Sequence, residues 1–118
     1  MVASRIIVVD DNGNMARTLS DILVLNGFKV TYSLSAREAL EHIHKQPYDC
    51  LISDIKMPDM DGVQLSRQVK ESAHPIPVIL TTAYTTQHIL QEMADLGVEK
   101  VFMKPIEVES LLGYLKTL

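Results

Sequence analysis

The feature that most restricts the fold of this chain is a set of short apolar runs that end abruptly at polar residues. Residues 5–9 (Arg-Ile-Ile-Val-Val) stop at Asp10 and Asp11, and residues 49–53 stop at Asp54. Apolar character that continues over so few residues indicates a strand covered on both faces, because a strand with one wet face would alternate with polar residues. The runs therefore predict a parallel sheet.

Segments with helical spacing separate the apolar runs. Apolar residues recur three and four positions apart from Met15 to Leu23, and this pattern ends at Asn26-Gly27, a typical helix stop. Ser35 and Glu38 are expected to form a capping box for the second helix. The five helices are expected to begin near Met15, Ala36, Val63, Gln87 and Val108, and the other strands to lie at 28–32, 78–80 and 98–103.

This alternation of five strands with five helices predicts an α/β fold. Connections of a few residues require right-handed crossovers, which place helices on both faces of a doubly wound, five-stranded parallel sheet. The chain has 118 residues, which suits one hydrophobic core. We expect a single domain over residues 1–118.

Charge and composition narrow the classes of function. Lys and Arg number 11 against 15 Asp and Glu, a net charge of −4, so direct nucleic-acid binding is not expected. The longest apolar run is far shorter than the roughly 20 residues that a membrane span needs. The first residues lead directly into a strand and leave no room for a signal peptide, and the single cysteine, Cys50, lies in an apolar run. A cytoplasmic location without membrane contact is expected.

The polar residues that follow the strands predict a phosphoryl site. In a parallel sheet the carboxyl ends of the strands meet at one edge, which brings together Asp10 and Asp11, Asp54, the pair Thr81-Thr82, and Lys104. Two like charges about 4 Å apart repel by about 4 kcal/mol at an effective dielectric near 20, so the carboxylates need a cation. Hard oxygen ligands suit Mg²⁺, and a metal, a lysine and a hydroxyl can each pair with a different phosphoryl oxygen. One carboxylate is then free to accept the phosphoryl group.

Four motifs in this order resemble the receiver domain of response regulators, the phospho-acceptor module of two-component signalling. They are Val8-Val9-Asp10-Asp11, the run from Asp54 to Gly62 (Asp-Ile-Lys-Met-Pro-Asp-Met-Asp-Gly), Thr82-Ala83 and Lys104-Pro105. The resemblance covers residues 5–118. It implies a flavodoxin-like sheet with strand order 2-1-3-4-5 and a signal receiver in a phosphorelay, a regulatory domain and not a conventional enzyme.

The resemblance also implies a role for each site residue. Asp54 would accept the phosphoryl group from a sensor histidine kinase or a histidine phosphotransfer protein. Asp10, Asp11, Asp54 and the backbone carbonyl of Lys56 would hold Mg²⁺. Thr82 would be the switch hydroxyl, and Lys104 would form an ion pair with the phosphoryl group, with a cis bond to Pro105.

Partners are implied by the same resemblance. The donor would contact the first helix and the loop after Lys104, and the output would pass through the helix–strand–helix face from about Gln87 to Leu115. An effector domain, absent from this chain, or a second copy would bind that face. Many receivers carry an aromatic residue three positions before the lysine, but Val101 stands there, with Phe102 on the opposite strand face.

Several alternatives stay open at the level of sequence. A small Mg²⁺-dependent aspartyl phosphatase of the haloacid-dehalogenase type would use similar groups, but that family has a second aspartate where Lys56 stands. Asp10 and Asp11 could cap the first helix, and Thr82 could bond its own loop backbone.

Two more residues concern the lifetime of the phosphorylated state. Lys56 and Tyr84 could shield a phosphoryl group from water, or both could point into solvent. Asp59 and Asp61 are assigned to the turn before Gly62.

Overall fold

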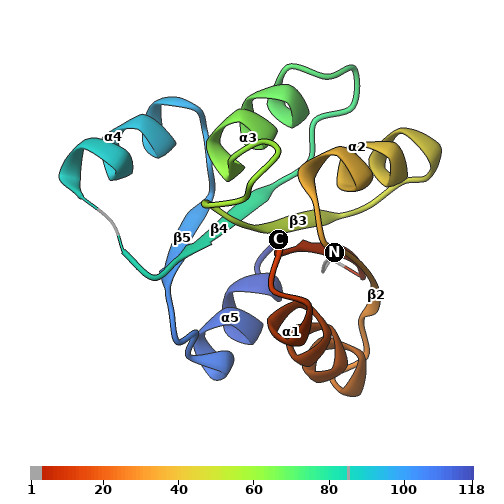
Figure 1. Ribbon diagram of the computed structural model, residues 1–118. Coiled ribbons are helices and arrows are strands. Elements are labelled where there is room, and N and C mark those ends of the chain that lie inside the picture. Colours follow the sequence, from red (N-terminus) through yellow and green to blue (C-terminus); the bar gives the residue numbers. More distant parts are fainter. Residues whose placement is uncertain (1–3, 85) are drawn as a thin grey trace.

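The computed structural model describes residues 4–84 and 86–118 and has five strands alternating with five helices (Figure 1). The strands are β1 (Arg5–Val9), β2 (Lys29–Ser33), β3 (Cys50–Asp54), β4 (Val78–Thr82) and β5 (Lys100–Met103). The helices are α1 (Gly13–Leu25), α2 (Ala36–Lys45), α3 (Gly62–Lys70), α4 (Gln87–Asp95) and α5 (Val108–Leu115).

The strands form one parallel sheet with the order β2-β1-β3-β4-β5, which confirms the expected fold. The register aligns the carboxyl ends of the strands. Val9 pairs with Ser53, and Asp54 pairs with Thr81. Residues that follow these strands therefore leave the sheet at the same edge.

Side chains of each central strand divide between two apolar layers. Ile7 and Val9 face the layer covered by α2, α3 and α4, whereas Ile6 and Val8 face the layer covered by α1 and α5 (Figure 1). All four are almost fully buried. Burial on both faces explains why β1, β3 and β4 appear in the sequence as continuous apolar runs.

Element boundaries differ from the expected ones by one or two residues. β3 begins at Cys50 and includes Asp54, and the Asp49 carboxylate just before it accepts hydrogen bonds from the N–H groups of Ser4 and Arg5. β5 begins at Lys100, because the Val98 N–H still bonds to the preceding helix. The Asp49 bonds join residues far apart in the chain, and the Val98 bond is a backbone bond at the end of α4, so neither is visible in hydrophobic periodicity.

The helix signals read from the sequence are largely confirmed. The Ser35 hydroxyl accepts from the Glu38 N–H, although the reciprocal capping box is found at Asp61 and Gln64 on α3. Gly27 and Gly97 follow α1 and α4 with φ of 93° and 79°, a backbone conformation that favours glycine.

The buried interior agrees with the interpretation of Cys50 as a structural thiol. Its side chain is fully buried, and burial raises the pKa of the thiol to about 12. A thiol that stays protonated is a poor nucleophile. None of the helices in the described part of the chain combines the length and hydropathy needed to cross a membrane.

Glu99, directly before β5, links the sheet to both helical layers at the amino ends of the strands. Its carboxylate forms an ion pair with Lys70 on α3 at 2.8 Å and accepts from the Val78 N–H at 2.7 Å. Its backbone carbonyl accepts from the Tyr114 hydroxyl on α5 at 2.9 Å. No local sequence pattern indicates this connection, because its members are far apart in the chain.

Gly62 lets the loop after β3 fold back onto the end of that strand. Its N–H donates to the Ile55 carbonyl at 2.6 Å. A Cβ on Gly62 would lie 2.4 Å from the Asp54 carbonyl oxygen and 2.9 Å from the Ile55 Cα. Both contacts are with backbone, so a side chain at this position would move the strand end that carries Asp54.

We expect Gly62→Ala to lower the free energy of unfolding by about 1–3 kcal/mol, the usual cost of forcing extra atoms into a packed site. Gly113→Ala is the matched control, since a Cβ there meets nothing within 4 Å. That helical change should raise stability by about 0.5–1 kcal/mol. Urea unfolding of both variants measures the effects, and equal stability of the two would contradict the close-approach argument.

Candidate functional site

Three carboxylates meet at the carboxyl ends of β1 and β3. One oxygen from each of Asp10, Asp11 and Asp54 lies within 4.8 Å of the others. Asp10 is buried with 6% of its surface exposed, Asp54 is half-buried and Asp11 is exposed. The group therefore opens to solvent on the Asp11 side, as a site that exchanges a small ligand requires.

Lys104 connects two of these carboxylates. Its Nζ lies 3.0 Å from Asp10 Oδ2 and 3.2 Å from Asp54 Oδ2. The side chains of all three residues are no more than 14% exposed, so solvent screens these ion pairs less than it screens a surface pair. The Lys104–Pro105 bond is cis, as expected. The sequence prediction that these distant residues meet is confirmed.

Burial and neighbouring charges shift the pKa values of Asp54 and Lys104. Burial raises the pKa of the Asp54 carboxyl, and the nearby Asp10 charge adds to this, although Lys104 opposes both. Burial alone would lower the pKa of the Lys104 ammonium, but the hydrogen bond to Asp10 and the charges of Asp10 and Asp54 raise it overall. Lys104 is therefore a permanent cation at neutral pH.

Asp10 is held in place by the start of α1. Its Oδ1 accepts from the Asn12 N–H at 2.9 Å, while Oδ2 binds Lys104. The N-cap of α1 is Asn12, whose side chain accepts from the Met15 N–H. The alternative in which Asp10 and Asp11 serve as the helix cap is therefore wrong.

Thr82, the last residue of β4, lies buried at the same edge but does not bind the carboxylates in this structure. Its hydroxyl donates to the Tyr84 carbonyl at 2.6 Å and accepts from the Tyr84 N–H at 3.2 Å. The hydroxyl of Thr82 thus bonds its own loop backbone, the alternative that stayed open at the level of sequence. Thr81 is directed elsewhere, with its hydroxyl 3.5 Å from the Ser53 carbonyl.

Lys56 and Tyr84 are both exposed, Tyr84 by 64%. Lys56 lines a shallow cavity of about 410 Å³ together with Asp11. Lys56 therefore lies on the same side of the site as the exposed carboxylate, and its backbone carbonyl stays a predicted fourth oxygen ligand. Both side chains are open to solvent in this structure, and shielding of a phosphoryl group by them stays a prediction.

The two further aspartates of the loop after β3 have structural roles. Asp61 caps α3, as the turn assignment predicted. Asp59 instead accepts from the N–H groups of Ala36 and Arg37 at the start of α2, at 3.4 and 3.0 Å. These backbone bonds outweigh burial and lower the pKa of the Asp59 carboxyl. They connect this loop to α2, a tertiary contact that no local sequence pattern indicates.

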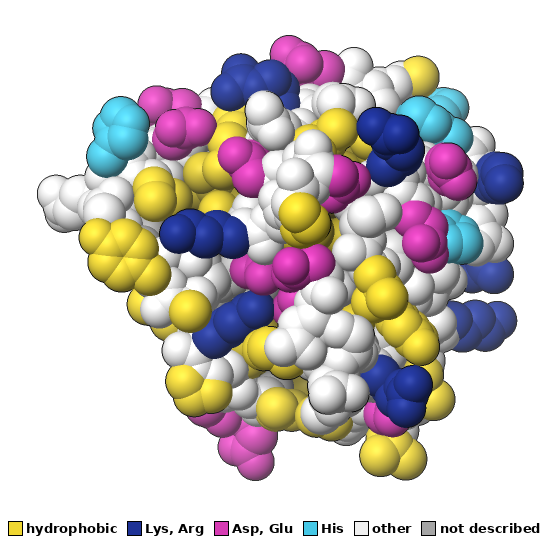
Figure 2. Space-filling model, in the orientation of Figure 1, with side chains coloured by type: hydrophobic (Ala, Val, Ile, Leu, Met, Phe, Trp, Pro, Cys, Tyr) yellow, Lys and Arg dark blue, Asp and Glu magenta, His cyan; other side chains and the backbone are white. Residues whose placement is uncertain are grey.

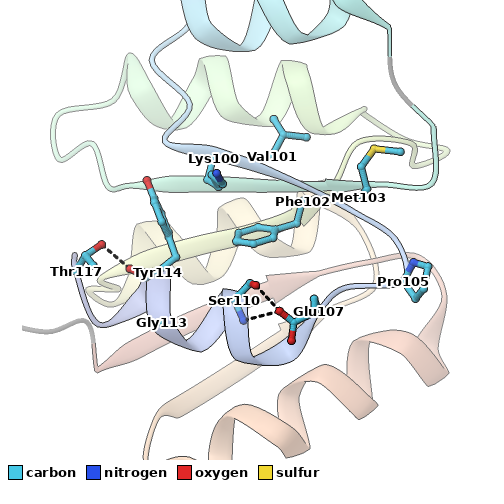
Figure 3. Close-up of a pocket in the computed structure, with 10 residues that line it drawn as sticks. All are labelled: Lys100, Val101, Phe102, Met103, Pro105, Glu107, Ser110, Gly113, Tyr114 and Thr117. Carbon is cyan, nitrogen blue, oxygen red and sulfur yellow. Dashed lines mark hydrogen bonds between the residues drawn. The ribbon is translucent and has the colours of Figure 1, made fainter.

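A separate cavity of about 670 Å³ lies between the outer edge of β5 and α5 (Figure 3). The rings of Phe102 and Tyr114 meet edge to face in it, with centroids 6.3 Å apart, and the Lys100 ammonium lies 5.9 Å from the Phe102 ring centre. Val101 packs into the opposite layer. Val101 and Phe102 therefore lie on opposite faces of β5, as strand alternation predicted. Phe102 does not replace the aromatic residue that is absent at position 101.

The surface view is consistent with a charged site set among apolar side chains. Figure 2 shows acidic side chains near the middle of the face, basic side chains close to them, and hydrophobic side chains scattered around both. The exposed hydrophobic residues include Met15, Leu34, Tyr84 and Met103.

Comparisons with known proteins agree with this arrangement. A family model for the response regulator receiver domain matches residues 6–116. The transcriptional regulatory protein ZraR of Escherichia coli is 31% identical over 111 residues, which are 94% of this chain and 25% of that protein. The response regulator MprA of Mycolicibacterium vanbaalenii is 31% identical, over 97% of this chain and 49% of its own length. The chain therefore spans a quarter to a half of these two relatives.

Other relatives match over nearly their whole length. Sporulation initiation phosphotransferase F of Bacillus subtilis is 28% identical over 98% of this chain and 94% of its own. The crystallised chemotaxis protein CheY4 of Vibrio cholerae superposes with a TM-score of 0.91 at 28% identity, covering 97% of both chains. The chain belongs to the response regulator receiver domain family of two-component signalling. The comparisons give no support to the haloacid-dehalogenase alternative.

Addition of Mg²⁺ should raise the melting temperature, because a cation that binds the carboxylates only in the folded state stabilises that state. At 100 times its dissociation constant a ligand adds about 2.7 kcal/mol. Asp11→Asn should remove most of the shift, while Asp21→Asn, an exposed change on α1, should keep it. Calorimetry with and without millimolar Mg²⁺ makes the measurement, and an identical shift in both variants would argue against the site.

Proposed function

We propose that this receiver domain accepts a phosphoryl group on Asp54 from a phosphohistidine of a sensor histidine kinase or histidine phosphotransfer protein. The observation that carries the proposal is the position of Lys104, whose ammonium lies 3.0 Å from Asp10 and 3.2 Å from Asp54. A cation fixed beside a half-buried carboxylate can stabilise a phosphoryl group on that carboxylate. Membership of the receiver family supports the same reaction.

Asp54 is better suited than Asp10 to be the acceptor. Both oxygens of Asp10 are engaged, one by the Asn12 N–H and one by Lys104. Asp54 shares one oxygen with Lys104. In the proposed transfer a carboxylate oxygen of Asp54 forms a bond to phosphorus, the P–N bond of the phosphohistidine breaks, and its electron pair returns to the imidazole nitrogen.

The donor set also fits a divalent cation. Asp10, Asp11, Asp54 and the backbone carbonyl of Lys56 would hold Mg²⁺, since carboxylate and carbonyl oxygens are its preferred ligands. When bound, the metal supplies positive charge that offsets the charge on the phosphoryl oxygens. The protein's part is to hold the carboxylates at this spacing despite their repulsion, and Lys104 contributes to that in the absence of any ligand.

Lys104 and Thr82 would respond to the phosphoryl group after transfer. Lys104 has only to exchange one carboxylate oxygen for a phosphoryl oxygen. Thr82 must first release the Tyr84 backbone, because its hydroxyl is bonded there. Movement of Thr82 would thereby change the segment that leads into α4.

The output would pass through the surface formed by α4, β5 and α5. β5 is an edge strand with a cavity beside it, and it carries Lys104 at its carboxyl end. An effector domain or a second copy of the domain would contact this surface. The length of the relatives ZraR and MprA supports the first partner, since this chain covers only part of each. We place this regulatory function in the cytoplasm, where a phosphorelay of this family would operate.

Asp54→Asn should abolish phosphoryl incorporation. Incubation with Mg²⁺ and acetyl phosphate, followed by intact-mass measurement, should show one added phosphoryl group on the wild-type protein. The control Asp21→Asn changes an exposed α1 carboxylate and should be labelled like wild type. Labelling of the Asp54→Asn variant at the wild-type level would refute the assignment of the acceptor.

Phosphorylation should shift the Tyr84 amide resonance, because that N–H loses the Thr82 hydroxyl as its acceptor. Thr82→Ala should place the resonance near the phosphorylated position without any phosphoryl donor, and Thr82→Ser should behave like wild type. Amide spectra recorded before and after labelling test this. A Tyr84 signal that moves equally in wild type and Thr82→Ala on labelling would exclude release of Thr82 as the cause.

A further inference from the structure

Lys104 has a third neighbour that the proposed reaction does not use. An ammonium group carries three N–H donors, and this one lies 3.0 Å from Asp10 Oδ2 and 3.2 Å from Asp54 Oδ2. Its third neighbour is Met15 Sδ of α1, 4.0 Å from Lys104 Nζ. A thioether sulfur is a weak acceptor, so this contact holds the lysine only loosely.

Met15 is open to solvent, with 39% of its surface exposed. It also lines a shallow cavity of about 330 Å³ with Asn12, Pro105 and Ile106, directly beside the lysine. Met93, by contrast, is 2% exposed and lies in the core. A small oxidant dissolved in water can therefore reach the Met15 sulfur without unfolding the domain.

We propose that Met15 is a reversible oxidation site through which peroxide lowers the phosphoryl acceptance of the domain. The inference rests on the proposed function of Asp54 and Lys104. A peroxide transfers one oxygen atom to the Met15 sulfur, the sulfur is oxidised by two electrons to the sulfoxide, and the O–O bond breaks with release of water or an alcohol. Methionine sulfoxide reductases reverse the change.

The sulfoxide oxygen changes the balance of forces on Lys104. It is a strong, polar acceptor that extends from the sulfur, so the 4.0 Å gap to Nζ closes to an ordinary hydrogen bond of about 2.8 Å. The ammonium is then held towards α1 and competes less well for an oxygen of the incoming phosphoryl group. Slower phosphorylation of Asp54 follows, with the fold unchanged.

The test treats the purified domain with hydrogen peroxide, maps the sulfoxides by peptide mass spectrometry, and measures the rate of labelling by acetyl phosphate and Mg²⁺. We expect oxidised wild type to be labelled about tenfold more slowly, the factor that about 1.4 kcal/mol of added barrier produces. Treatment with methionine sulfoxide reductases should restore the rate. Each protein is compared with its own unoxidised sample.

Two variants separate Met15 from Met103, another exposed methionine at this edge. Met15→Leu keeps an apolar side chain of similar size but cannot be oxidised, so its rate should not respond to peroxide. Met103→Leu keeps Met15, and since Met103 is 49% exposed it controls for oxidation elsewhere. The rate of Met103→Leu should fall as in wild type. An equal fall in Met15→Leu, or failure of Met15 to oxidise when Met103 does, would overturn the proposal.

A second measurement is independent of labelling. The ¹⁵N and ¹H resonances of the Lys104 ammonium should shift on oxidation of wild type and stay in place in Met15→Leu. Unoxidised wild type that takes up no phosphoryl group would refute the proposed function. If wild type takes up the phosphoryl group, but neither its labelling rate nor its Lys104 ammonium resonances change when Met15 is oxidised, this inference alone is refuted.

Discussion

The arrangement of the site depends on one ion pair that spans almost the whole chain. Lys104 and Asp10 are 94 residues apart in sequence, yet the lysine joins the first strand to the fifth across the end of the sheet. Like charges in a half-buried position repel strongly, and the lysine offsets that repulsion for Asp10 and Asp54 together. Breaking a buried pair of this kind leaves an uncompensated charge, so the site keeps its carboxylates at this spacing only while the lysine is in place.

The two apolar layers make this concentration of charge tolerable. The interiors of β1, β3 and β4 contribute only apolar or small side chains to the core, and the charged residues are confined to the strand ends. Hydrophobic burial therefore stabilises the sheet without help from the site. The charges at the strand ends can therefore be arranged to bind a ligand, even though their repulsion lowers the stability of the fold.

Much of this arrangement was predictable from the sequence, for a physical reason. Runs such as Ile6–Val9 report burial on both faces directly, and parallel strands must bring Asp10, Asp54 and Lys104 to one edge. Contacts that depend on side-chain reach were not predictable. The bond from Thr82 to the Tyr84 backbone appeared only as an open alternative, and Asp59 binds the start of α2 instead of only its own turn.

The contacts of Glu99 make the two ends of β5 differ in how they are held. At its amino end the strand is attached to α3 through Lys70, to β4 through the Val78 N–H and to α5 through Tyr114. At its other end it carries Lys104, whose partners are ion pairs that a ligand can exchange. Side-chain contacts thus fix the amino end of β5, whereas the side chain at its carboxyl end has exchangeable partners. The backbone there is still bonded to β4, because the Lys104 N–H donates to the Thr82 carbonyl at 2.7 Å. A change in the partners of Lys104 is therefore passed to the residue that carries the switch hydroxyl, while the contacts of Glu99 keep the opposite end of the strand in place.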